Sequence, residues 1–504
     1  MTAGFPPPRV ASSTLATTRG RRILLLLCAV AFMDFVDASI TNVAIPHIRT
    51  ALHFSAQDLQ WVPSAYLLTY GGFMLLGGRL ADLAGRRTII LAGTSLVGVA
   101  SLAGGLAGDS GVFVAARLAQ GLGAALMLPA ALSTLTTTFR ETGDRNRALG
   151  VWGAVAGLSS AAGILLGGVL TEGPGWRWVM FVNPIACAVI IPAVLAVLPH
   201  DRPSAASGRF DLPGSLLATG GMLALVFALV KAPGQGWGAA TTGWELAVAA
   251  VLLAAFLVNE RLTRDPLLPL GIFRTRGLLA ANVTGFVGFS GLLAMFYFLT
   301  LYMQNVLGYS PVEAGAAYLP LTFAVGISAG IGAKLLTKLG SRPVIVAGAL
   351  IAAAGMFLLG HVPVHGTYAP DILPGLLLVS LGLGPVFVGV TSAANAGVPA
   401  DQAGVAAAVM NSFQQTGGAL GLAIMSAVAT SQTAQSVARG TGLAQASASG
   451  YQHALLTGCW LTAGAALIAL RMVNTRQASM MAGQPAHGDE DVADTGLTAA
   501  SATD

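Results

Sequence analysis

Charged residues are scarce in this sequence: Asp, Glu, Lys and Arg make up only 9% of its 504 residues, whereas 55% of the residues are hydrophobic. A soluble globular domain carries roughly 25% charged residues, which cover much of its surface. The composition therefore excludes a soluble protein and predicts an all-α polytopic membrane protein. The net charge of +5 then reflects membrane topology, and we expect no binding of nucleic acid.

Cysteine and enzyme signatures are also lacking. The three cysteines, Cys28, Cys187 and Cys459, lie in apolar runs and are odd in number, so they indicate neither a disulfide framework nor a metal site. No phosphate-binding Gly-x-x-x-x-Gly-Lys-Ser/Thr loop, His-Glu-x-x-His pair or Gly-x-Ser-x-Gly elbow is present. We therefore expect no catalytic residue, no metal and no cofactor, and ATP-driven transport is disfavoured.

Long apolar runs dominate what the sequence does contain. Fourteen of them are roughly 18–25 residues long, enough to cross a bilayer as helices. They lie at 23–45, 59–79, 88–107, 112–137, 147–170, 177–198, 212–231, 243–260, 278–303, 313–336, 342–361, 371–396, 404–430 and 454–472. The stretch 431–452 between the last two is expected to be the longest outer loop.

The basic residues predict the orientation of these spans. With fourteen spans both termini lie on the same side, and 21 of the 26 Lys and Arg residues fall on that side. Four lie on the opposite side, and Arg117 lies inside a span. Such an excess marks the cytoplasmic face, so we expect a multi-pass protein of the cytoplasmic membrane with both termini in the cytoplasm. No cleavable signal peptide is expected.

A weak internal repeat predicts the domain organisation. The loop Gly78–Arg87 reads GRLADLAGRR, and Ala333–Arg342 reads AKLLTKLGSR, a worn copy with Thr337 in place of Asp82. Parallel repeats of six helices are the building plan of one large class of transporters. The expected domains are disordered cytoplasmic tails at 1–22 and 473–504, six-helix halves at 23–198 and 278–472, and two inserted central helices with their linkers at 199–277.

Two acids interrupt the first span. Asp34 and Asp37 are three residues apart and therefore share one face of a helix. A charge near the middle of a span costs roughly 2.5–3.5 kcal/mol, so intramembrane acids usually mark a pathway for substrate or protons. The alternative is that both acids snorkel or form structural pairs within the bundle. We expect Asp37 and Asp34 to take part in proton coupling and substrate binding.

The fourth span contains the complementary charge. In Arg117-Leu-Ala-Gln120-Gly-Leu-Gly, the arginine cannot lose its proton and must have a partner. A structural arginine bonded to backbone carbonyls is the alternative. Further polar residues expected in a membrane cavity are Asn42, Gln120, Asn411 and Gln414.

Glycines shape two further motifs. In the loop after the second span, Gly78 and Gly85 permit close backbone approach, and Asp82 has Arg86 and Arg87 as charge partners. This loop is expected to act as a gate. The fifth span carries small residues at the spacing of tightly packed membrane helices. These helix-packing residues are Gly153, Gly157, Gly163, Gly167 and Gly168.

These motifs, in this order, resemble the major facilitator superfamily, in particular its fourteen-helix drug:proton antiporter branch. The resemblance runs from about residue 23 to 472 and includes Asp37–Pro46, Trp176–Pro184, Phe210–Gly214, Gly308–Gly315 and Asn411–Gly418. In that family the arginine of the fourth helix is associated with proton coupling. Ile164 stands where the family's antiporter motif has proline, which puts the kink of that motif in doubt.

The resemblance implies proton-coupled export of a lipophilic or cationic drug or antibiotic by alternating access of two halves, which would confer resistance. The expected partners are the small-molecule substrate, protons and the lipid bilayer, with the chain acting as a monomer. A proton-coupled transporter of a specific metabolite or lipid is the alternative, because one fold carries many cargoes. A non-transporting membrane receptor would show no substrate-dependent flux.

Overall fold

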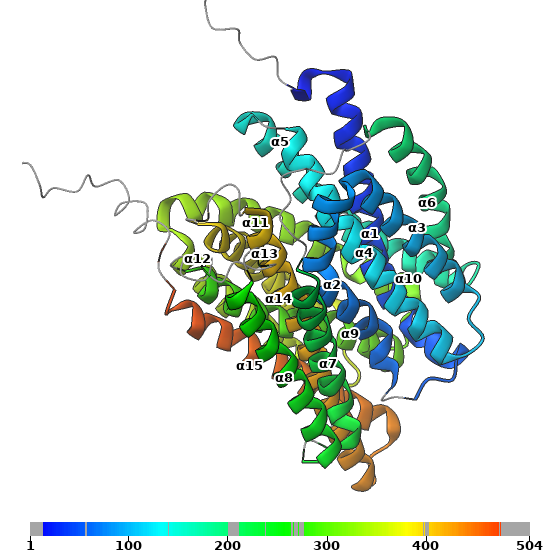
Figure 1. The fold of residues 1–504 in the computed structure, drawn as a ribbon. Helices are drawn as coiled ribbons and strands as arrows, with labels where there is room; N and C mark the ends of the chain where they lie inside the picture. The colour runs from blue at the N-terminus through cyan, green and yellow to red at the C-terminus, as the bar shows by residue number, and fades with distance from the viewer. Residues whose placement is uncertain are drawn as a thin grey trace, which may run out of the picture.

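The computed structural model describes residues 14–55, 58–139, 141–199, 211–236, 238–263, 266, 271, 277–396, 398, 403–472 and 474. Within these ranges the chain is helical and contains no strand (Figure 1). The first six long helices are α1 (Thr18–Ala51), α2 (Trp61–Ala84), α3 (Arg86–Gly105), α4 (Ser110–Thr138), α5 (Thr142–Glu172) and α6 (Arg177–Val197). Two short 3₁₀ turns, η1 (Thr14–Ala16) and η2 (Asp58–Gln60), precede α1 and α2.

The second part of the chain is built in the same way. Its helices are α7 (Leu212–Gln235), α8 (Ala240–Leu262), α9 (Leu278–Asn305), α10 (Pro311–Ala317), α11 (Leu319–Leu339), α12 (Ser341–Leu359), α13 (Leu373–Asn395), α14 (Ala403–Ala438) and α15 (Leu443–Ala469). A π-helical turn, η4 (Tyr368–Ile372), leads into α13. Among the described residues, nine helical segments are long and apolar enough to cross a membrane. The helices α2, α5, α7, α14 and α15 have comparable lengths and pack beside them.

Each of the fourteen expected spans coincides with described helix, and the prediction of an all-α membrane fold is confirmed. The tenth span is divided into α10 and α11 at Tyr318, because Pro320 cannot donate a helical hydrogen bond. The stretch 431–452 is mostly helical, because α14 continues to Ala438 and α15 begins at Leu443, and a connection of four residues, 439–442, joins them. Its alanine- and glutamine-rich sequence favours helix, and Gly440 makes the turn with φ 83°.

The helices form two groups with a pair between them. Helices α1–α6 pack largely on one another, as do α9 and α11–α15. In Figure 1 the first group lies to the right and α11–α13 and α15 to the left. The inserted helices α7 and α8 pair with each other, and α7 leans on both α2 and α14. Residues 1–13 and 475–504 of the expected tails lie outside the described residues, and the domain boundaries stay a prediction.

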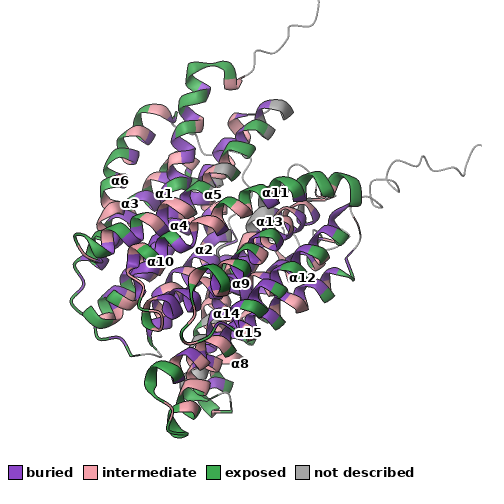
Figure 2. Cartoon of the chain, turned by 180° about the vertical axis from the view of Figure 1, so that it is seen from behind, coloured by how far each residue is buried: buried purple, intermediate pink, exposed green. Residues whose placement is uncertain are grey.

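Among the described residues, the largest buried hydrophobic cluster lies at one end of the molecule and joins both helix groups. At the end where α1 reaches Ala51, this cluster joins α1 and α5 of the first group with α9 and α13 of the second, and it includes α10, which packs mainly on α5. At the end where α1 begins, the buried residues form two separate clusters. The first of these lies within α1–α6, and the second is built mainly from α9 and α12–α15. Figure 2 shows that purple, buried positions run through the interior of both groups. The two groups are thus sealed together at the Ala51 end.

Helix α5 is the seam of this sealed end. A Cβ on Gly163 or Gly167 would overlap the backbone carbonyls of α1, and a Cβ on Gly168 would overlap Pro311 of α10. Gly153 has open space around it, and the side-chain surroundings of Gly157 lie outside the described residues. Helix α5 runs unbroken from Thr142 to Glu172, with Ile164 inside it. Among the glycines of the motif whose surroundings are described, Gly163, Gly167 and Gly168 serve close packing and Gly153 does not.

The repeated loops have the same backbone shape. Gly85 ends α2 with φ 92°, and Gly340 ends α11 with φ 85°. Side-chain-bearing residues rarely adopt such angles, so glycine is required at both positions. The repeat seen in the sequence is thus a repeat of backbone geometry at two matching helix ends.

Candidate functional site

The centre of the first helix group is an ion pair that is almost fully buried. An Arg117 Nη1 from α4 lies 3.3 Å from Asp37 Oδ2 on α1, and each side chain is 2% exposed. The same arginine donates from Nε to the carbonyl oxygen of Val62 at 3.1 Å. Arg117 thus has both a carboxylate and a backbone partner inside the bundle, which a permanently charged group in this environment requires.

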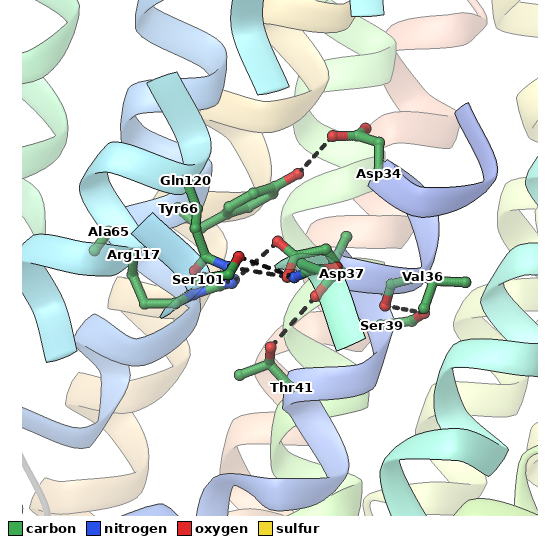
Figure 3. A network of polar contacts seen from close by, with 12 residues as sticks. Asp34, Val36, Asp37, Ser39, Thr41, Ala65, Tyr66, Ser101, Arg117 and Gln120 are labelled. Carbon is green, nitrogen blue, oxygen red and sulfur yellow. Dashed lines mark hydrogen bonds and ion pairs between the residues drawn. The ribbon is translucent and has the colours of Figure 1, made fainter. Parts of the chain in front are cut away.

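Three further polar side chains complete the cluster around Asp37. Gln120 Nε2 donates to Asp37 Oδ1 at 3.1 Å and to Ser101 Oγ at 2.7 Å. Asn183 Nδ2 donates to the same Asp37 oxygen and, at 3.2 Å, to Ser101. Figure 3 shows Gln120 and Arg117 converging on Asp37 from α4, with Ser101 close by. Asp37 therefore gathers donors from α4 and α6, and Ser101 of α3 bridges two of them.

Asp34 has a separate set of partners. Its carboxylate accepts hydrogen bonds from Tyr66 at 3.1 Å and from Tyr70 at 3.3 Å, both on α2. The side chain is 2% exposed, and the two tyrosine rings lie 5.5 Å apart. Although the two acids share a helix face, one is paired with a cation and the other with neutral hydroxyls. Their chemistry consequently differs.

The polar residues considered in the second helix group lie on α9 and α14, whereas the Asp37–Arg117 pair lies on α1 and α4. Asn411 and Gln414 are on α14, which packs on α2, α7, α9 and α15. Gln414 is buried, and its Nε2 has no hydrogen-bond partner among the described residues. Asn282 of α9 is fully buried, and neither of its amide atoms has one within the same ranges. The structure thus brings Asp37, Arg117 and Gln120 together and leaves Asn411 and Gln414 elsewhere.

The predicted gating loop is only partly described. The side chain of Asp82 lies outside the described residues, so its pairing with the arginines stays a prediction. Arg86 Nη1 donates to Thr137 Oγ1 at 2.6 Å, and Arg87 Nη2 donates to the carbonyl oxygen of Leu195 at 2.8 Å. Gly78 packs against Pro129 of α4. These contacts tie the start of α3 to the ends of α4 and α6.

Several members of the site were not predicted from the sequence. Ser101, Tyr66 and Tyr70 carry no motif, and Asn183 was noted only as part of Trp176–Pro184. Their common signal is a polar side chain inside an apolar run, which costs free energy unless it is bonded. Asn42 lies on α1 five residues beyond Asp37, half-buried, with its amide directed to the carbonyl of Ala38 at 3.4 Å.

The family model for the major facilitator superfamily matches residues 27–422. The chain is 41% identical over 415 residues to the puromycin resistance protein of Streptomyces alboniger, with 82% of each chain covered. It is 37% identical over 436 residues to a cephamycin export protein of Amycolatopsis lactamdurans, covering 85% of this chain and 88% of that one. A tetracenomycin C resistance and export protein of Streptomyces glaucescens is 36% identical over 429 residues, covering 84% and 79%.

Solved structures share the fold at low sequence identity. A transporter of the POT family matches with a TM-score of 0.67 at 17% identity, over 92% of this chain and 98% of that one. A D-xylose–proton symporter matches with a TM-score of 0.64 at 14% identity, over 90% and 98%. These structures show the fold alone, whereas the family model over residues 27–422 and the relatives of 36–41% identity show that the chain belongs to the major facilitator superfamily.

Proposed function

We propose that this chain is a proton-coupled antiporter that exports a lipophilic or cationic antibiotic-like compound and so confers resistance. The observation that carries the proposal is the buried Asp37–Arg117 pair with its amide donors, placed inside a membrane-spanning bundle. Ionisable groups at such depth are costly and mark ion or substrate pathways. The relatives named for antibiotic resistance and export supply the class of cargo.

The proposed orientation follows from the basic residues. The end where α1 begins carries the excess of Lys and Arg, so it faces the cytoplasm, and both termini lie there. The continuous core then closes the outer side, and the two separate clusters lie on the cytoplasmic side. This arrangement supports an inward-facing conformation, in which a monomer receives cargo from the cytoplasm or the inner leaflet.

The proposed exchange runs through Asp37. In this structure its carboxylate has an arginine and two amide donors, the set that an ionised acid requires. When a proton arrives from the outside, Asp37 becomes neutral and the pairing with Arg117 weakens. Arg117 then relies on Gln120 and on the Val62 carbonyl. The two arrangements correspond to the two sides of alternating access, and inward proton flow drives outward movement of the cargo.

The proposal is tested by puromycin-dependent proton movement in proteoliposomes that contain the full chain. In proteoliposomes with the wild-type chain, we expect the addition of puromycin to dissipate an imposed proton gradient. The Asp37→Asn variant keeps a polar group of the same size but cannot exchange a proton, so coupled movement should fall at least about 100-fold, as for other acid–base groups. Tetraphenylphosphonium serves as a second, cationic cargo.

The matched control is Asp58→Asn, because Asp58 is an exposed acid that caps a turn by bonding to Ser55. It should behave as wild type. Full coupled export by Asp37→Asn would exclude the proposed role of Asp37. If no compound of a wider antibiotic panel moves protons, and one metabolite does, the cargo class is wrong.

A further inference from the structure

Tyr66 contacts both acid sites of α1: it bonds to Asp34 directly and reaches the Asp37–Arg117 pair through Arg117. Its hydroxyl donates to Asp34 Oδ1 at 3.1 Å, and its ring lies under the Arg117 guanidinium, with 4.5 Å between Cζ and the ring centroid. Figure 3 shows the ring between Asp34 and Arg117. Tyr66 is 2% exposed, so bulk water does not bridge these contacts.

The neighbouring Tyr70 shows what is special about Tyr66. Tyr70 also donates to Asp34, at 3.3 Å, and lies one helical turn further along α2. Its described contacts include the Tyr66 ring but no stacking on Arg117. Of the two tyrosines that hold Asp34, one is therefore in contact with the Asp37–Arg117 pair and the other is not.

We propose that Tyr66 is the positioning residue that couples the two acids of α1. When Asp34 binds a proton or a cationic cargo, Tyr66 transmits the change to the Asp37–Arg117 pair. This inference rests on the proposed proton-coupled export and assigns a route within it. A hydrogen bond to an ionised carboxylate is roughly twice as strong as one to a neutral group. Neutralising Asp34 therefore weakens the hydrogen bond from the Tyr66 hydroxyl, and the Tyr66 ring can then move away from Arg117.

The second contact then transmits the change. A guanidinium over an aromatic face is stabilised most where water is excluded, as it is here. When the ring moves, Arg117 loses that contact, and the balance between its carboxylate partner and its carbonyl partner shifts. Because coupling is reciprocal, protonation of Asp37 also changes how Asp34 binds cargo. One rigid side chain thus links Asp34 to the proton-carrying Asp37.

The charged and titratable groups around this route are few. Those that act on Tyr66 are Asp34 and Asp37 of α1, Tyr70 of α2 and Arg117 of α4. Those that act on Asp34 are Asp37 and the two tyrosines. The ion pair on this route is Asp37–Arg117, whose side chains are both 2% exposed. A change in coupling after substitution of Tyr66 can therefore be assigned to these groups.

The test compares Tyr66→Phe with Tyr70→Phe in proteoliposomes of the full chain. Each substitution removes one hydroxyl donor to Asp34 and keeps the aromatic ring. The protons moved per molecule of puromycin, and of tetraphenylphosphonium, are measured between pH 6 and pH 8, a range spanning roughly physiological values. Binding of each compound at one pH and the melting temperature are measured in parallel.

We expect Tyr66→Phe to lower the number of protons moved per cargo molecule about tenfold, the effect of losing one hydrogen bond to a charged group. Its binding at a fixed pH should stay within about threefold of wild type. Tyr70→Phe should keep the wild-type ratio at every pH. Tyr66→Leu, which removes both the hydroxyl and the ring, should lose coupling at least as fully while remaining folded.

The alternative outcomes are distinct. If the two phenylalanine variants change the ratio equally, or if neither changes it, Tyr66 serves only to pack and hold Asp34, and the inference is overturned. If wild type moves no protons with either compound, the proposed antiport fails and the inference fails with it. Wild-type coupling combined with an unchanged Tyr66→Phe variant thus identifies failure of the inference alone.

Discussion

At the scale of single residues, the site is defined by how completely each buried polar group is bonded. Asp37 accepts from Arg117, Gln120 and Asn183, so its charge is compensated inside the bundle. Asn282 differs from Asp37 in this respect, because neither of its amide atoms has a hydrogen-bond partner within the described ranges. A buried, unbonded polar group costs about 1–3 kcal/mol and needs a reason to be kept. We expect contact with the cargo to be that reason.

Replacing Asn282 should therefore separate stability from transport. Asn282→Leu has a similar volume and removes the unbonded amide, so we expect the protein to become more stable by about 1 kcal/mol. Export of puromycin should decrease, since the polar contact is lost. Melting temperature and vesicle export measure the two effects.

The matched control for this substitution is Asn183→Leu. That asparagine is equally buried but donates to Asp37 and Ser101, so its replacement should lower the melting temperature. A drop in stability for Asn282→Leu would show that its amide is bonded in the folded protein, contrary to the structure.

At the scale of elements, α5 packs closely on α1 within its own group and on α10. Its glycines at 163 and 167 let it lie against the backbone of α1, and Gly168 does the same for α10. In lipid, where helices gain nothing from excluding water between them, such close backbone contact is a main source of association. Gly163, Gly167 and Gly168 thus set how closely α5 approaches its neighbours, and the hydrogen bond from Val312 to Glu172 adds a polar contact to α10.

We expect Gly167→Ala to weaken this contact. The added Cβ would lie 2.5 Å from the carbonyl oxygen of Ile40, a backbone atom that cannot turn aside, so α5 must shift. Overpacking of this kind costs about 1–3 kcal/mol. The melting temperature and the export rate should both fall.

The comparison is Gly153→Ala on the same helix. A Cβ there meets nothing within 4 Å, and alanine is the better helix former, so this variant should be as stable as wild type or slightly more stable. Equal effects of the two substitutions would mean that the glycines act through helix propensity and not through packing.

At the scale of the whole molecule, the asymmetric core implies a single closed side. The continuous cluster at the Ala51 end joins both groups, and polar contacts reinforce it there. Gln304 Nε2 of α9 donates to the carbonyl oxygen of Val43 on α1 at 2.8 Å, close to Pro46 within that helix. Glu172 of α5 accepts from the backbone of Val312 on α10. In the proposed orientation, opening to the outside must break these contacts together.

This closure predicts a change in accessibility during transport. In a chain whose native cysteines are replaced by alanine, Gln304→Cys should react slowly with a membrane-impermeant maleimide in intact cells. Asn305→Cys, at the adjacent exposed position, should react about tenfold faster, because local burial limits reagent access. Addition of puromycin with an inward proton gradient should raise labelling of Gln304→Cys only.

Two results would contradict this description. Equal labelling of both positions without cargo would mean that the outer side is open at rest. Labelling of Gln304→Cys that never changes during export would mean that the two groups do not separate at this end.

The composition and the hydropathy pattern were enough to predict the membrane class and the helical spans, because burial in lipid acts on each segment by itself. The extent of helix at 431–452 did not follow from hydropathy, because in a polar stretch hydropathy no longer distinguishes helix from loop and local helix propensity decides. The need for a partner for Arg117 was also evident, since its charge is permanent.

What only the tertiary structure decided is which groups meet. Asp34 and Asp37 lie on one helix face, yet only Asp37 reaches Arg117, whereas Asp34 faces two tyrosines of α2. Asn183 and Ser101 come from helices that are distant in sequence. Such pairings depend on how α1, α2, α3, α4 and α6 pack against one another, and the spacing of residues within one helix carries no information about the rotation of its neighbours.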